Sequence, residues 1–249
     1  MFHVKHATLR IVRRQLGEWG VGLSKDRLEM LKEYSLLLAG YERANIIGTR
    51  DPEEILLEHV LDSLSCLLFP PLLRARRVVD VGSGGGLPGI PLKILLPEAE
   101  MVFVEATGKK ARFLEHAVQR LGLRGARVVN DRVEEVGRES GHRSAYDVAL
   151  ARAVAALPVL AEYCVPLVRV GGHVVAMKGR IGEEELRGGG AAARILGARI
   201  SGVIEVTRLP EVGEKKKREL IVLEKEGETP GQYPRKTGIP AKRPLAAGV

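Results

Sequence analysis

The chain has 249 residues, enough for one large domain or for one domain with a smaller appendage, and its 45% of hydrophobic residues is typical of a globular protein. Because no stretch of ~18 uncharged apolar residues occurs and the N-terminus lacks an apolar signal core, we expect neither a membrane span nor a secretory signal. The net charge of +8 comes from the two ends: residues 1–16 and 229–249 carry basic residues and no acidic ones, while the rest is balanced.

The basic ends have two interpretations. They either contact a polyanion, where neutralised phosphates release counterions, or they are solvated tails, and charge alone does not separate the two. Cys66 and Cys164 lie far apart without Cys-x-x-Cys spacing, as expected in a reducing cytosol, so we predict a cytoplasmic protein. Asparagine and glutamine are scarce, which suggests a thermophilic source. We also expect a monomer.

The N-terminal part of the chain is predicted to be helical. Leucines recur at helical spacing after Ser24, a possible N-cap. A second helix should start with Asp51 as N-cap, Pro52 in the first turn and Glu54 at the capping-box position. It should run to about Phe69, where two prolines end it.

Short strands then alternate with helical segments. Strands are predicted at 77–81, 101–105, 127–130, 146–150 and 172–177, and helices at 89–96, 108–121, 132–139 and 155–168. This alternation implies parallel pairing with right-handed crossovers. Two longer β-rich runs, with seven residues between them, predict an antiparallel hairpin at the sheet's edge, at 199–210 and 218–227.

The predicted fold is therefore α/β, a seven-stranded, doubly wound, Rossmann-like sheet with an N-terminal helical extension. We expect the extension at 1–76, the core at 77–228 and a basic C-terminal tail at 229–249. The Gly-Gly-Gly-Ala-Ala-Ala run at 188–193 predicts a weak or broken helix, because no strand feeds it as a phosphate loop would require.

A glycine-rich stretch, VVDVGSGGGLPGIP at 78–91, requires a sharp turn with an exposed backbone. A P-loop is excluded because no Gly-Lys-Ser/Thr follows. The dinucleotide pattern GxGxxG is matched at 84–89, but it starts after the strand has ended, whereas a dinucleotide fingerprint opens directly at the strand's end. The pattern acid-x-Gly-x-Gly-x-Gly fits better, at Asp80, Gly82, Gly84 and Gly86. A tight turn without a ligand is the remaining alternative.

This last pattern resembles the first motif of class I methyltransferases that use S-adenosylmethionine. Since that cofactor has no phosphate, the glycines need only let the backbone close against its sugar and methionine, and Asp80 can face its ammonium group. Glu105 lies at the end of the next strand, about where an acid ~20 residues on takes the ribose hydroxyls. NAD enzymes share such an acid, so Glu105 alone does not discriminate.

The resemblance to one family is carried by six segments in this order: NIIGTRDPEEILLEHVLDSL, VDVGSGGGLPGIP, KKARFL, LARAVAAL, AMKG and YPRKTGIPAKRPL. Together they resemble the glucose-inhibited division protein B family, methyltransferases of small-subunit ribosomal RNA. The resemblance runs from about Ser24 to Leu245. It implies transfer of the methyl group of S-adenosylmethionine to N7 of one guanine, with 16S ribosomal RNA or the small ribosomal subunit as partner.

The resemblance also implies a cofactor site made of residues that follow the strands: Gly82, Ser83, Gly84, Leu87, Glu105, Ala106, Thr107, Val133, Glu134 and Arg152. The alternative interpretation of Val133 is plain core packing, and the alternative for Arg152 is a structural salt bridge. His59 and Asp62 share one helix face and either hydrogen-bond the core from an N-terminal lid or border the guanine site.

No certain catalytic residue is expected, since guanine N7 has a free lone pair and no proton to remove. The positioning candidates are Arg152, Lys178, His59 and Asp62. The candidate RNA contacts are Lys178, Arg235 and Lys236, and the run 215–218 is interpreted as a solvated hairpin tip. No metal site is expected, because the histidines and cysteines form no ligand set.

Two other classes compete with this interpretation. Two observations argue against a dinucleotide-dependent oxidoreductase: the spacing of Asp80 and Gly82 relative to the end of the strand, and the absence of a proton-donating His or Tyr near the strand ends. A non-catalytic RNA-binding protein on the same fold would not need the intact glycine turn, Glu105 and Arg152, which favour retained cofactor binding.

Overall fold

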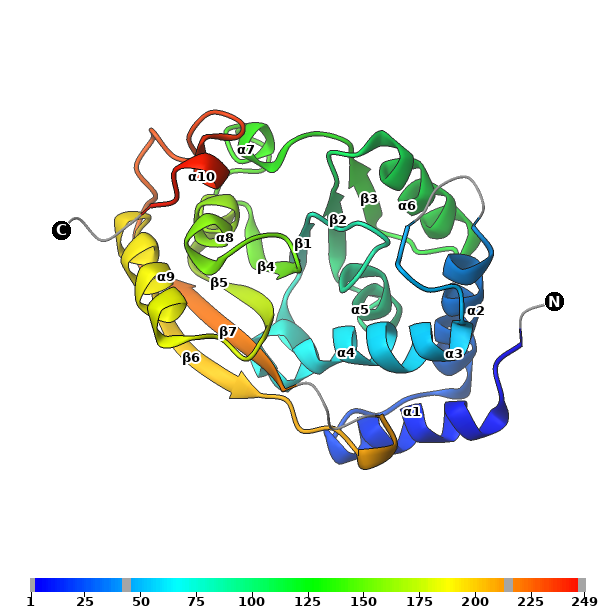
Figure 1. The fold of residues 1–249 in the computed structure, drawn as a ribbon. Helices are drawn as coiled ribbons and strands as arrows, with labels where there is room; N and C mark the ends of the chain where they lie inside the picture. Colours follow the sequence, from blue (N-terminus) through cyan, green and yellow to red (C-terminus); the bar gives the residue numbers. More distant parts are fainter. Residues whose placement is uncertain (1–2, 42–45, 213–216, 246–249) are drawn as a thin grey trace.

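A computed structural model describes residues 3–41, 46–212 and 217–245, and these form a seven-stranded sheet with flanking helices (Figure 1). The strand order is β3-β2-β1-β4-β5-β7-β6. Neighbouring strands are parallel, except that β7 is antiparallel to both β5 and β6. The strands are β1 (Arg77–Val81), β2 (Glu100–Val104), β3 (Ala126–Val129), β4 (Tyr146–Arg152), β5 (Val168–Gly179), β6 (Ala198–Glu205) and β7 (Arg218–Lys225). The predicted doubly wound sheet with an edge hairpin is confirmed.

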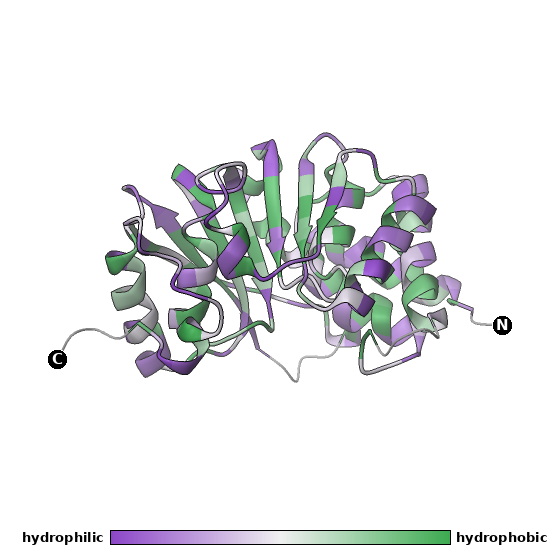
Figure 2. Ribbon diagram, turned by 90° about the horizontal axis from the view of Figure 1, so that it is seen from above, coloured by the Kyte–Doolittle hydropathy of each residue, from purple (hydrophilic) through white to green (hydrophobic). Residues whose placement is uncertain are grey.

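Two hydrophobic layers cover the sheet, because successive strand side chains point to opposite faces. Val78 and Phe103 belong to the layer with the N-terminal helices, while Val79 and Val102 belong to the other. Hydrophobic residues are concentrated along the strands in Figure 2. The first layer contains α1 (His6–Glu18), α2 (Lys25–Gly40), α5 (Gly89–Leu95) and α6 (Gly108–Arg120). The second contains α7 (Val133–Val136), α8 (Leu157–Cys164) and α9 (Glu183–Ile195).

The N-terminal extension contains both predicted helices, but their details differ. Ser24 caps α2 by accepting from the Arg27 amide. The second helix is a chain of short segments: α3 (Pro52–Glu54), the π-helical η1 (Ile55–Val60), α4 (Leu61–Leu64), and the 3₁₀ turns η2 (Ser65–Leu68) and η3 (Pro70–Arg74). π-Helical turns are frequent at functional sites, and this one contains His59.

The capping box predicted at the start of this helix is wrong. Asp51 does cap it, accepting from the Glu53 amide at 2.9 Å. Glu54, however, accepts from the Thr49 hydroxyl at 2.6 Å, and the Asp51 amide donates to that same hydroxyl oxygen at 3.2 Å. Thr49 therefore takes the place that the Glu54 carboxylate would occupy in a capping box.

The glycine-rich run at 188–193 lies inside the continuous helix α9, so the predicted weak or broken helix is wrong. A Cβ atom at Gly189 would lie 2.3 Å from Leu157 Cδ2, which shows how closely α9 packs on α8. The packing of two helices outweighs the low helix propensity of glycine here.

The last described segment, residues 229–245, which we call the C-terminal strap, packs across α7 and α8 and contains the short helix α10 (Ile239–Lys242) (Figure 1). A further 3₁₀ turn, η4 (Pro210–Val212), precedes β7. In the part of the chain that the structure describes, no helix is long and apolar enough to cross a membrane.

Candidate active site

The glycine-rich turn follows β1 at the carboxyl edge of the sheet. Gly82 has φ +66°, a left-handed conformation that side chains disfavour. A Cβ atom there would lie 2.8 Å from Val154 Cγ2, in the loop that follows β4. The loops after β1 and β4 therefore meet at Gly82, and open α/β sheets bind ligands at this edge.

Glu105 lies beside this turn, directly after β2. Its carboxylate accepts from the Gly84 amide at 2.8 Å and from the Thr107 amide at 2.7 Å, while its carbonyl accepts from Asn130 at 2.7 Å. With only 6% of its surface exposed, this carboxylate links the loops that follow β1 and β2.

Asp80 is fully buried below the same turn. One carboxylate oxygen accepts from the Gly89 amide at 3.1 Å, whereas Oδ1 has no hydrogen-bond partner among the described residues. Burial raises the pKa of Asp80 to about 7, against the opposing effects of the Gly89 and Ser83 hydrogen bonds. An unpaired buried oxygen of this kind suits a bound cation or an ordered water.

Arg152 ends β4 and points toward the N-terminal extension. Its guanidinium donates to the His59 carbonyl at 3.0 Å, to Ser63 Oγ at 3.2 Å and to His59 Nδ1 at 2.8 Å. Its Nε lies 3.5 Å from a carboxylate oxygen of Asp62. Since a guanidinium only donates, His59 Nδ1 must accept and carry no proton. Burial, and then the Arg152 charge, lower the pKa of His59 accordingly.

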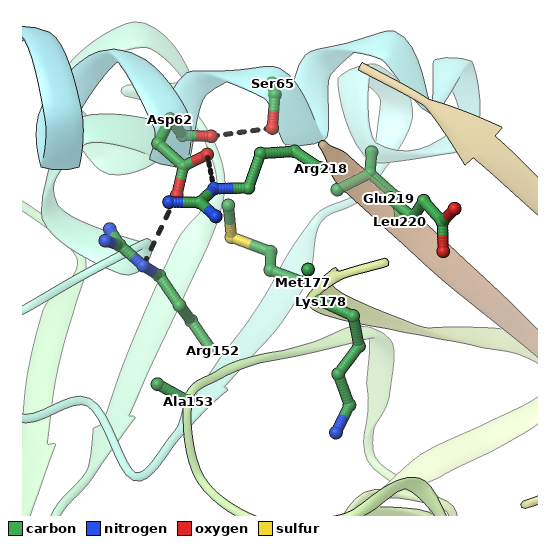
Figure 3. A pocket seen from close by; sticks show the side chains of 10 residues that line it. Asp62, Ser65, Arg152, Ala153, Met177, Lys178, Arg218, Glu219 and Leu220 are labelled. Carbon is green, nitrogen blue, oxygen red and sulfur yellow. Dashed lines mark hydrogen bonds and ion pairs between the residues drawn. The ribbon is translucent and has the colours of Figure 1, made fainter. Parts of the chain in front are cut away.

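A cavity of about 250 Å³ opens beside Arg152, between the extension and the ends of β4, β5 and β7. The other oxygen of Asp62 accepts from Arg218 Nε at 3.1 Å, so Asp62 lies between two guanidiniums (Figure 3). The cavity is lined by Asp62, Ser65, Arg152, Ala153, Met177, Lys178, Gly179, Arg218, Glu219 and Leu220.

Arg218 is a site residue that the sequence interpretation missed, because it assigned 215–218 to a solvated hairpin tip. Residues 213–216 lie outside the described residues, but Arg218 is the first residue of β7 and pairs with Gly179. The topology contained a signal: the second strand of an antiparallel edge hairpin starts at the carboxyl edge of the parallel strands.

Three other predicted site residues are paired within the chain. The Lys178 ammonium bonds the Ala155 carbonyl at 2.7 Å and Glu185 at 2.8 Å. Arg235 in the C-terminal strap forms an ion pair with Glu162, whose side chain is fully buried. Glu134 accepts from an amide of the strap, Gly238 N, at 2.9 Å and is 3% exposed. Their proposed roles toward cofactor or RNA stay predictions.

The remaining predicted residues are distributed around the turn. Ser83 is buried, and its hydroxyl donates to the Asp80 carbonyl at 2.8 Å. Leu87 and Val133 are partly buried in the two core layers, whereas Ala106 and Lys236 are exposed. Among residues 3–41, 46–212 and 217–245, no group of three His, Cys, Asp or Glu side chains is placed to hold a metal ion.

Comparison with known proteins decides the family. A family model described as rRNA small subunit methyltransferase G (GidB) matches residues 27–216. The chain belongs to this family. Ribosomal RNA small subunit methyltransferase G of Rubrobacter xylanophilus is 69% identical over 247 residues, which cover 99% of this chain and 95% of the relative. The protein of that name from Moorella thermoacetica is 43% identical, covering 91% and 93%.

Solved structures place the fold among the class I methyltransferases. An O-methyltransferase from Bacillus cereus in complex with SAH has a TM-score of 0.56 at 14% identity, covering 88% of this chain and 100% of that one. A cofactor-bound protein, Rv0187, has a TM-score of 0.51 at 19% identity, covering 82% and 92%. At such low identities the likeness concerns the fold, and it confirms the predicted fold class.

Proposed function

We propose that the chain transfers the methyl group of S-adenosylmethionine to N7 of a specific guanine in small-subunit ribosomal RNA. The observation that carries this proposal is one edge of the sheet, where the glycine turn and Glu105 adjoin the cavity of Asp62, Arg152 and Arg218. Membership of a family of ribosomal RNA methyltransferases supports the substrate class.

Two carboxylates favour a cationic cofactor over a dinucleotide. Glu105 accepts from the Gly84 amide of the turn with one oxygen and from the Thr107 amide with the other, and Asp80 keeps one buried oxygen unpaired in the described structure. A pyrophosphate would add negative charge beside both groups, which like-charge repulsion disfavours. S-adenosylmethionine instead has ribose hydroxyls that would donate hydrogen bonds to Glu105 and an ammonium group that would stabilise the charged form of Asp80. When bound, this cofactor supplies an electrophilic sulfonium methyl group.

The protein's own contribution to the reaction is orientation. Guanine N7 needs no deprotonation, and well-oriented reactants gain ~7–11 kcal/mol over free encounter. Asp62 pairs with both Arg152 and Arg218 at the cavity, and this arrangement suits a base or phosphate group of the target nucleotide. The target guanine must be unpaired or flipped out of a helix, at a cost of a few kcal/mol.

RNA backbone contacts are proposed at the rim of this cavity. Arg180 and Lys217 are exposed and flank the Gly179–Arg218 pair. Neither forms an ion pair or a side-chain hydrogen bond within the described structure, unlike Lys178 and Arg235. Arg180 and Lys217 are therefore better placed to neutralise phosphates than Lys178 and Arg235, which the sequence analysis predicted for this role.

The compartment and the oligomeric state complete the proposal. We place the reaction in the cytoplasm, which is supported by Cys66 and Cys164 both being buried, unpaired thiols. The monomeric state stays a prediction.

Methyl transfer to purified small subunits tests this function. Wild-type protein, methyl-labelled S-adenosylmethionine and subunits from a strain lacking the gene should yield labelled ribosomal RNA. Glu105→Gln should lose most of the label because it removes the negative charge and places an NH₂ donor opposite one of the two amides that Glu105 accepts from, whereas Glu115→Gln, an exposed glutamate on α6, should keep it. Unlabelled RNA despite cofactor binding would contradict the substrate, and a wild-type protein that binds no cofactor would contradict the reaction.

A further inference from the structure

The glycine turn is in direct contact with the N-terminal extension. Tyr34, on α2, is fully buried, and its hydroxyl donates to the Gly85 carbonyl in the middle of the turn. Around Gly85 the packing is also close: a Cβ atom there would lie 2.9 Å from Ile46 Cγ2 and 3.1 Å from Leu38 Cδ2. The extension thus forms one wall of the turn on which the proposed cofactor rests.

Two side chains hold neighbouring polar groups of this turn. Glu105, from the end of β2, accepts from the Gly84 amide, and Tyr34 donates to the Gly85 carbonyl. Glycine loses more conformational freedom than any other residue when it is ordered. Three consecutive glycines, at 84–86, therefore need such external contacts to keep a single conformation before a ligand arrives.

The chemistry of Tyr34 suits a permanent donor. Burial, and to a smaller extent the nearby Asp80 carboxylate, raises the pKa of Tyr34 well above its ordinary value. The hydroxyl therefore keeps its proton throughout the neutral range. A buried carbonyl that loses its donor is costly, so the turn would move or fluctuate if the hydroxyl were absent.

We propose that Tyr34 is a positioning residue for the cofactor: it preorganises the 84–86 backbone so that binding does not have to order the turn. This inference rests on the proposed function, since it assumes that the turn holds S-adenosylmethionine. It gives the N-terminal extension a role in cofactor affinity as well as in the RNA-side cavity, to which the extension contributes Asp62.

Tyr34→Phe tests the inference, with Tyr41→Phe as the matched control. Tyr41 follows α2 and packs its ring on Phe113, 4.8 Å between centroids, and its hydroxyl has no hydrogen bond within the described structure. Tyr34→Phe should weaken binding of S-adenosylhomocysteine and raise KM for S-adenosylmethionine about 2- to 12-fold, the range for one net hydrogen bond. The kcat at saturating cofactor should stay at the wild-type value, and Tyr41→Phe should change neither constant.

The outcomes separate the inference from the function on which it rests. The inference alone would be overturned if calorimetry gave wild-type protein and Tyr34→Phe the same affinity for S-adenosylhomocysteine. This holds whatever the change in melting temperature. Wild-type protein that binds no cofactor would overturn both. If Tyr34→Phe does not fold, Gly85→Ala replaces it, because a methyl group there pushes the turn away from Ile46 with the hydroxyl intact. Unchanged affinity in that variant would equally contradict the inference.

Discussion

Asp80 shows how burial and charge oppose each other at a single residue. Its carboxylate lies under the glycine turn with one oxygen bonded to Gly89 and the other unpaired in the described structure. Because its folded pKa of about 7 lies above the ordinary 3.8, the folded chain holds this proton more tightly than the unfolded chain does. Stability contributed by the protonated form is therefore complete at low pH and declines as the pH rises from about 4 to 7.

Replacing Asp80 by asparagine should remove this pH dependence. The carboxamide is neutral at every pH and can still accept from the Gly89 amide. We expect the wild type to lose stability relative to Asp80→Asn between about pH 4 and pH 7, with a constant difference on either side of this window. Urea unfolding of both proteins across the window measures this, and a difference that does not vary with pH would contradict it.

At this scale, the sequence predicted which residues follow the strands and gave a salt bridge as an alternative for Arg152, but it did not identify the partner residues. The turn glycines and Glu105 come together as expected, because they follow the neighbouring parallel strands β1 and β2, whose carboxyl ends lie at one edge of the sheet. Arg152 faces His59 and Asp62, 93 and 90 positions earlier in the chain. Such long-range pairs are absent from local patterns, and only the packing of the extension on the sheet creates them.

Among the helices, α9 illustrates why a composition-based prediction was wrong. Its run of glycines weakens an isolated helix, yet at Gly189 α9 packs so tightly on Leu157 of α8 that a Cβ atom would not fit. Gly190, its neighbour, has Ile200 Cδ1 at an ordinary 3.6 Å from the ideal Cβ position. Adjacent glycines in one helix thus have different packing environments, and sequence periodicity alone does not distinguish them.

Alanine substitutions at these two glycines should have opposite effects. Gly189→Ala should destabilise the protein by about 1–3 kcal/mol through overpacking against Leu157. Gly190→Ala should stabilise it by about 0.5–1 kcal/mol, because alanine has the higher helix propensity and its methyl group would make only an ordinary van der Waals contact with Ile200. Chemical denaturation measures both, and equal effects of the two substitutions would show that the α8–α9 packing is not as close as described.

For the whole molecule, the predicted fold class, sheet and family are confirmed. Which basic residues form ion pairs within the chain was only partly predictable. The excess of basic residues at the chain ends is visible in the sequence. Within the described ends, however, Lys5 pairs with Glu53, Arg14 with Glu211, and Arg235 with a fully buried Glu162. Net charge counts cations but does not tell which ones are already paired.

RNA affinity should therefore depend on the cavity rim. Replacing both Arg180 and Lys217 by glutamine should weaken small-subunit binding and reduce the slope of log K against log salt by roughly two, about one per lost phosphate contact. Arg187→Gln on α9, whose partner Glu183 is exposed, serves as the control and should leave the slope unchanged. Binding titrations at several salt concentrations measure this, and an unaltered slope in the double variant would place the RNA elsewhere.

The identity of the methylated nucleoside tests the central claim most directly. Small subunits lacking the modification are incubated with the wild-type protein and methyl-labelled S-adenosylmethionine, and their RNA is digested and analysed by mass spectrometry. The account predicts label in 7-methylguanosine at one position, because guanine N7 has a free lone pair and its methylation needs no proton acceptor, only the orientation that we propose for the cavity. Label in a nucleoside methylated at an exocyclic amine, a ring carbon or a ribose hydroxyl would contradict it.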